Sequence, residues 1–189
     1  MQKSEIEELF YKQKNYSKIK ELLQNSNQSW SFNLLGKIYL EEGDTKNAYK
    51  LFQKTGNVEI CAYTKFLNNE LNEAYIILLL LKDNSPFSNW LLALISILLD
   101  KKEYLPTYFQ IRNFYEQDLE MLFKVKQYSL IKRLLKKNEY FEKFNKEIYK
   151  YSARVLFNNN YILQAEKLIK KSISLCYKDP ETHYMLGEL

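Results

Sequence analysis

The chain has 189 residues, of which 46% are apolar and 15% aromatic, and this composition excludes an intrinsically disordered protein. Four glycines and three prolines are too few for a β-rich fold, because such folds use these residues in many tight turns. The formal net charge of +5 comes mostly from lysine, and the scarcity of arginine argues against nucleic acid as the partner, since guanidinium groups make the bidentate contacts to bases.

Cys61 and Cys176 are the only cysteines, and we expect both to be buried, reduced thiols of an intracellular protein of the nucleus or cytoplasm. The amino terminus is charged from its start, unlike a secretory signal. The longest apolar runs, residues 74–81 and 90–99, are well short of the roughly 20 residues that a membrane span requires. The sequence therefore predicts buried helices in these runs and no membrane partner.

The first predicted elements are two helices, residues 4–13 and 16–24, which form a hairpin. Ser4 is expected to cap the first helix, and Glu7 three residues later completes a capping box.

The next hairpin begins at Ser29 and has the clearest repeat pattern in the chain. Phe32, Gly36 and Tyr39 have the spacing of the tetratricopeptide unit, a 34-residue pair of antiparallel helices. Gly36 and Ala48 occupy the two small-residue sites at which the paired helices cross, where larger side chains would push the helices apart. Residues 43–44 form the turn between the two helices.

A second copy follows, with Ala62 and Ala74 at the small-residue sites. Pro86 ends this copy, because proline cannot donate the next helical hydrogen bond. Residues 87–113 are then predicted to form an irregular hairpin, with Ser85 as its N-cap and Pro106 delaying or kinking its second helix.

Sites 34 residues apart repeat in the last part of the chain. Leu119, Ala153 and Gly187 share one site, and Ile131 and Ala165 share another. The final copy stops after its first helix, so we expect the natural protein to continue. Residues 1–189 are predicted to form a single array, an α-solenoid of about six hairpins and a truncated helix.

Residues that could carry out catalysis are sparse. His183 is the only histidine, and no cluster of metal ligands accompanies it. Four glycines cannot supply a phosphate-binding loop. We expect no metal, no cofactor and no enzymatic activity.

The first helices of a hairpin stack line a concave groove, and we expect Lys150, Arg154 and Phe157 to lie in it. The spacing of Lys150 and Arg154 is that of the carboxylate clamp with which cochaperones of this fold hold a peptide C-terminus. The preceding copy presents Glu116 and Glu120, which would repel a carboxylate, so we expect the clamp to be absent. Two interpretations of the basic pair remain, an inter-repeat ladder of ion pairs and contact with a partner protein.

The apolar surface exceeds what the predicted helices need for their own core. Residues 76–81 and 90–99 are apolar all round, and such helices are usually buried on every side. Either the superhelix or a second subunit encloses them. We expect a homodimer, because twofold association is the commonest way to cover such surfaces.

The order of these elements resembles the amino-terminal half of the tetratricopeptide scaffold subunits of the anaphase-promoting complex, a ubiquitin ligase of cell division, and especially their subunit 8 branch. The helix at residues 31–39, the hairpin around 72–75 and the Trp-Leu-rich helix after Pro86 carry the resemblance. It implies a scaffold that binds other subunits of a larger assembly and dimerises through its amino-terminal repeats. By this analogy the dimer contact lies near Ile6, Leu9, Phe10 and Trp30.

The leading hypothesis is therefore a homodimeric, non-catalytic protein scaffold. The alternative is a peptide-binding tetratricopeptide adaptor or cochaperone. A basic, RNA-associated helical repeat is the third possibility, which the lysine runs at residues 132–137 and 167–171 keep open.

Overall fold

The computed structural model describes residues 3–81, 85–101, 111–143, 145, 147–176 and 178–188. Every regular element in these residues is a helix, which confirms the all-α class. In chain order the elements are α1 (Lys3–Glu8), the π-helix η1 (Leu9–Gln13), α2 (Tyr16–Leu23), α3 (Ser29–Glu41), α4 (Thr45–Thr55), α5 (Val58–Leu67), α6 (Leu71–Leu79), α7 (Pro86–Leu98), α8 (Ile111–Lys124), α9 (Tyr128–Lys136), α10 (Asn138–Phe141), α11 (Ile148–Asn158), α12 (Ile162–Leu175) and α13 (Pro180–Gly187).

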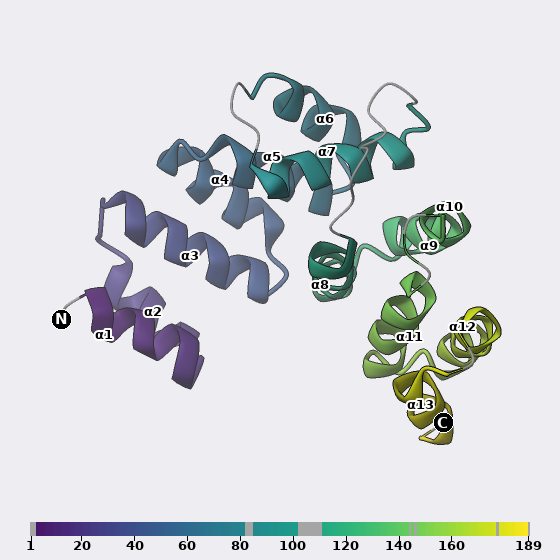
Figure 1. Ribbon diagram of the computed structural model, residues 1–189. Helices are drawn as coiled ribbons and strands as arrows, with labels where there is room; N and C mark the ends of the chain where they lie inside the picture. The colour runs from purple at the N-terminus through teal and green to yellow at the C-terminus, as the bar shows by residue number, and fades with distance from the viewer. Residues whose placement is uncertain are drawn as a thin grey trace.

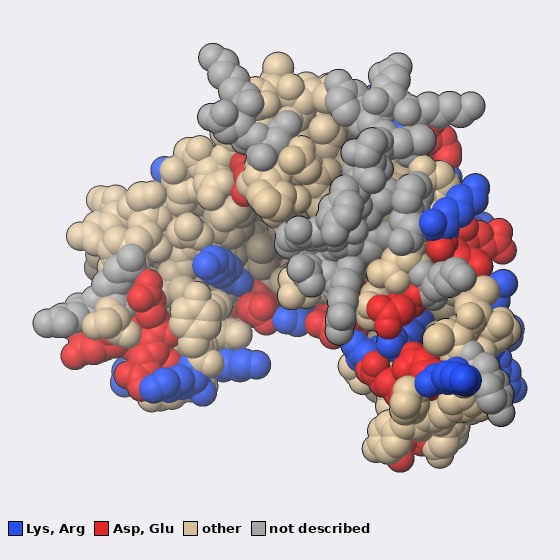
Figure 2. Space-filling view, viewed as in Figure 1, with Lys and Arg blue, Asp and Glu red and all other residues tan. Residues whose placement is uncertain are grey.

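The helices pack mainly against their neighbours in the chain, most extensively α3 with α4, α5 with α6 and α11 with α12. Helix α8 contacts both α11 and, across a longer stretch of sequence, α3. The chain forms an arch, with α1 and α2 at one lower end and α11 to α13 at the other (Figure 1). The space-filling view shows a hollow along the lower edge between these two ends (Figure 2).

Local capping explains several of the helix ends. The side chain of Asp44 accepts a hydrogen bond from the backbone N–H of Asn47 at 3.1 Å, and Ser85 accepts one from that of Ser88 at 3.1 Å, which confirms Ser85 as the N-cap of α7. Gly43, with a φ of 81°, supplies the left-handed turn between α3 and α4. The capping prediction for Ser4 is wrong, because α1 already includes Lys3 and Ser4 therefore lies inside the helix.

The predicted small-residue sites at Gly36 and at four alanines are buried, whereas Gly187 is exposed and a Cβ atom there would meet nothing within 4 Å. Ala48, Ala62, Ala74 and Ala165 are fully buried. A Cβ atom at Gly36 would lie only 2.6 Å from Cε1 of Phe52, whose side chain is itself fully buried. The close packing of α3 on α4 therefore requires glycine at position 36, because a larger residue would collide with the ring of Phe52.

The two apolar runs have different environments. All residues from Trp90 to Leu98 of α7 are buried, as expected. At the end of α6, Ile76 and Leu79 are exposed and Leu80 is 76% exposed, so this chain does not itself enclose the run, and its enclosure by a second subunit stays a prediction. Burial is thus confined to one face of α6. In the described ranges no helix is both long and apolar enough to cross a membrane.

The middle of the chain differs from the repeat pattern that the sequence predicts. The predicted second helix of the irregular hairpin and Pro106 lie outside the described residues, except that α8 begins at Ile111. After α9 the helix is interrupted and the short α10 follows. Asn138, the first residue of α10, is buried: its Oδ1 accepts from the hydroxyl of Tyr115 at 2.6 Å and its Nδ2 donates to Ser152 Oγ at 2.9 Å. These hydrogen bonds tie α10 to α8 and α11.

A buried carboxyl group, that of Asp118 on α8, joins three helices in the core. The indole N–H of Trp90 on α7 donates to its Oδ2 at 2.7 Å, and Tyr63 on α5 also hydrogen-bonds to it. Burial raises the pKa of Asp118 to about 7, although the hydrogen bonds from Trp90 and Tyr63 act in the opposite direction.

Both cysteines are free thiols. Cys61 is buried as predicted, but Cys176 is exposed, because it follows the last residue of α12 and caps the end of that helix.

Candidate protein-binding groove

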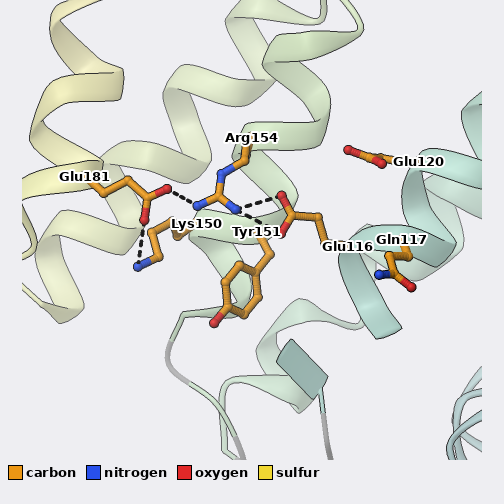
Figure 3. Close-up of a pocket in the computed structure, with 7 residues that line it drawn as sticks. All are labelled: Glu116, Gln117, Glu120, Lys150, Tyr151, Arg154 and Glu181. Carbon is orange, nitrogen blue, oxygen red and sulfur yellow. Dashed lines mark hydrogen bonds and ion pairs between the residues drawn. The ribbon is translucent and has the colours of Figure 1, made fainter. Parts of the chain in front are cut away.

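A polar cavity of about 380 Å³ lies between α8, α11 and α13, at the place where the sequence puts Lys150 and Arg154 (Figure 3). These three helices are the first helices of successive predicted repeats, so the cavity lies on the surface that such helices share. Its lining residues are Glu116, Gln117, Glu120, Lys150, Tyr151, Arg154 and Glu181.

Arg154 joins all three helices through its guanidinium group. Nη1 donates to both carboxylate oxygens of Glu116 on α8, each at 2.9 Å, and Nη2 pairs with Glu181 on α13. The planar fork of donors allows one side chain to serve two carboxylates. Burial acts against the charge on Arg154, but the bonds to Glu116 and Glu181 outweigh it and raise its pKa.

Lys150 is a buried cation surrounded by carboxylates. Its Nζ lies 2.8 Å from Glu147 Oε1, 3.0 Å from Asp179 Oδ2 and 3.3 Å from Glu181 Oε2. Burial tends to lower the pKa of Lys150, but the hydrogen bonds to Glu147 and Asp179 prevail and raise it. Asp179 is also the N-cap of α13, so this ion pair fixes the start of that helix against α11.

The charges of the cavity leave a negative surplus. Three carboxylates and two cations line it, and Glu147 and Asp179 add two more carboxylates beside Lys150. Glu120 is exposed at the edge and forms no ion pair within the described part of the chain (Figure 3). Charged side chains of both signs are intermixed in this part of the surface, over α11 and α13 (Figure 2).

These contacts confirm the inter-repeat ladder of ion pairs proposed from the sequence. The ladder occupies both cations, so a peptide carboxylate would have to displace Glu116 or Glu181 and would meet the surplus negative charge. The arrangement is thus unsuited to a carboxylate clamp. Contact of Lys150 and Arg154 with a partner protein stays a prediction.

Phe157 was expected in the same groove. It is partly buried, packs against the main apolar core and does not line the polar cavity. Its contribution to partner binding stays a prediction.

The four candidate dimer residues lie together near the amino terminus. Ile6 is buried in a cluster formed by α1, α2 and α3, whereas Leu9, Phe10 and Trp30 are partly exposed and pack on that cluster. Three of the four side chains therefore present some surface to solvent.

The only histidine of the chain lies outside the polar cavity. His183 is exposed on α13 and does not line it. Among the residues that the structure describes, no group of three His, Cys, Asp or Glu side chains could hold a metal ion.

A second, apolar cavity was missed by the sequence interpretation. It lies between α8, α9, α11 and the start of α12, with Tyr128 and Tyr161 at its edge. Two features of the sequence could have indicated it: the tyrosines at the starts of α9 and α12, and the lysine run that begins at Lys132.

Comparison of the chain with family models, with curated proteins and with solved structures finds no match.

Proposed function

We propose that the chain is a non-catalytic scaffold that binds other proteins through an α-solenoid of tetratricopeptide-like hairpins. The support is the packing of each helix on its chain neighbours, with small residues buried at the predicted crossing sites. A stack of this kind exposes a long continuous surface, which suits association along its length.

The proposal rests mainly on the ion pairs that Lys150 and Arg154 form in the polar cavity. Lys150 and Arg154 are each bound by carboxylates from neighbouring helices, so they stabilise the stack. A scaffold requires this rigidity, whereas a cochaperone of the clamp type requires cations available to a ligand.

Homodimerisation through the amino-terminal helices is the finer form of the proposal. Tyr11 is 65% exposed, and its ring lies 4.9 Å, centroid to centroid, from that of the partly exposed Phe10. Leu22 on α2 is 43% exposed. Exposed apolar side chains in these amino-terminal helices support an association site there.

Sedimentation velocity of the whole chain at micromolar concentration tests the dimer. We expect a dimer that the double substitution Tyr11→Glu/Leu22→Glu converts to a monomer with unchanged helix content. Tyr184→Glu, at an exposed site of α13, is the control and should leave the dimer intact. A monomeric wild-type chain would contradict the dimer and favour the adaptor alternative.

Membership of the anaphase-promoting complex is a further part of this proposal, supported by the order of the sequence elements. Its test is affinity purification of the tagged chain from its native cells, followed by mass spectrometry. The other scaffold subunits of that complex should co-purify in stoichiometric amounts, and their absence would contradict the assignment.

The alternative, a peptide-binding adaptor, is favoured by one specific observation. The apolar cavity beside α9 has a volume of about 460 Å³, within the range of about 300–1,000 Å³ found for ligand sites.

A further inference from the structure

The apolar cavity has walls from two successive helical hairpins. Phe123 at the end of α8 and Leu156 at the end of α11 contribute apolar side chains, as do Ile131 and Leu135 on α9. The remaining lining residues are Tyr128, Lys132, Lys136, Tyr161 and Gln164. Apolar atoms therefore form the floor, and the polar groups come from the edge.

Aromatic side chains form one end of this cavity. The ring of Phe123 lies 5.3 Å from that of Tyr161 and 6.3 Å from that of Tyr128, centroid to centroid. Phe123 is buried, but Tyr128 is 51% exposed. Such a surface can take up a large apolar side chain from outside.

Lysines form the rim on the side of α9. Lys132 and Lys136 are exposed, and neither is paired with a carboxylate among the residues that the structure describes. They are one helical turn apart, about 6 Å along the axis. Helix α9 contains no acidic residue, and the adjoining Lys137 is paired with Asp100 outside the cavity. The rim is therefore positively charged.

We propose that this cavity is the docking site for an acidic amphipathic segment of a partner protein, an inference that rests on the proposed protein-binding function. One or two large apolar side chains of the segment occupy the space beside Phe123 and Leu135. Carboxylates one turn apart on the segment pair with Lys132 and Lys136. A helix laid in a groove presents side chains with this periodicity.

Charge complementarity selects this occupant over a basic one. A segment rich in lysine would face Lys132 and Lys136, and neither α9 nor the lining of the cavity supplies a carboxylate to compensate. The aliphatic lining from Ile131, Leu135 and Leu156 favours an apolar side chain over a nucleobase, which binds between stacking aromatic or guanidinium planes.

Fluorescence anisotropy with a short synthetic peptide tests the proposal. The probe carries leucine and phenylalanine at positions i, i+3, i+4 and i+7 and glutamate elsewhere, and the comparison peptide has lysine in place of glutamate. The variants are Lys132→Glu/Lys136→Glu for the rim and Tyr128→Ala for the apolar end. Lys46→Glu/Lys50→Glu on α4 is the matched control, because these lysines are also exposed and four residues apart on a second helix.

We expect the acidic probe to bind at least ten-fold more tightly than the lysine peptide, and to weaken as salt is raised. The Lys132→Glu/Lys136→Glu variant should lose at least ten-fold in affinity and Tyr128→Ala several-fold, while the control changes less than two-fold. Thermal unfolding of each variant establishes that it is folded, and Tyr128→Ala tests the site independently of charge.

Four outcomes would overturn the proposal. Equal binding to the wild type and to the Lys132→Glu/Lys136→Glu variant would place the peptide elsewhere. Displacement of the probe by an RNA oligouridine would make the rim a phosphate-binding surface. Preference for the lysine peptide would reject an acidic partner but leave the protein-binding function in place. Binding of neither peptide would reject the docking site but not the dimer that sedimentation measures.

Discussion

Gly36 provides a direct test of how closely α3 and α4 pack. In the Gly36→Ala variant the new Cβ would lie 2.6 Å from Cε1 and 2.7 Å from Cζ of Phe52, far inside van der Waals contact. Phe52 is fully buried and cannot rotate into solvent. Overpacking of this kind costs about 1–3 kcal/mol, and the better helix propensity of alanine returns about 1 kcal/mol. The contact of 2.6 Å places the cost at the upper end of this range, so we expect a net loss of about 2 kcal/mol.

Urea unfolding followed by circular dichroism measures this loss, with Gly187→Ala as the matched control. Gly187 has the same site in the predicted repeat, but a Cβ there meets nothing within 4 Å. It should change the free energy of unfolding by less than about 0.5 kcal/mol, because the last turn of a helix frays.

A double-mutant cycle separates steric conflict from other effects. Phe52→Leu removes the clashing ring, so the loss from Gly36→Ala should shrink by about 1 kcal/mol or more in that background. Strict additivity of the two substitutions, or equal effects at Gly36 and Gly187, would refute the proposed crossing of α3 and α4.

Three further predictions concern other contacts. The pKa of Asp118 is about 7 in the fold against 3.8 for an exposed aspartate, so its contribution to stability is complete below pH 3.8 and is lost as the pH rises through 7. We therefore compare the free energies of unfolding of the wild type and of Asp118→Asn. Their difference should fall by about 4 kcal/mol between pH 4 and 8, and a difference that does not change with pH would contradict this prediction. Gly43→Ala should destabilise the fold by about 1–3 kcal/mol, which is more than Gly56→Ala. Both glycines have a positive φ, but only at Gly43 would the new Cβ meet a carbonyl oxygen, that of Lys124 at 2.9 Å. Thermal unfolding compares the two variants. A double-mutant cycle of Glu116→Gln and Arg154→Gln should give a coupling of about 0.5–1 kcal/mol that decreases with salt, since both side chains are partly exposed, and zero coupling would mean that the ladder does not stabilise the stack.

The sequence was sufficient for features that depend on near neighbours in the chain. The cap at Ser85, the turn at Gly43 and the buried alanines are specified by residues within one hairpin, because helix ends and crossing sites have strict local requirements. The same local logic failed for Ser4, where the chain continues the helix one residue further back.

The sequence also supplied two interpretations of Lys150 and Arg154 but could not choose between them. Glu116 and Arg154 are 38 positions apart, and Glu181 is 27 positions beyond Arg154. Whether such side chains meet depends on how successive hairpins are rotated relative to one another, which no local pattern encodes.

Composition and periodicity were thus sufficient to predict an all-helical protein and the buried small residues at positions 36, 48, 62, 74 and 165. Only the tertiary structure decided that Lys150 and Arg154 are held by carboxylates and that Lys132 and Lys136 stand beside an apolar cavity. The physical reason is that helix formation depends on contacts within a few residues, whereas the charge and shape of a surface depend on which side chains the packing of separate hairpins brings together.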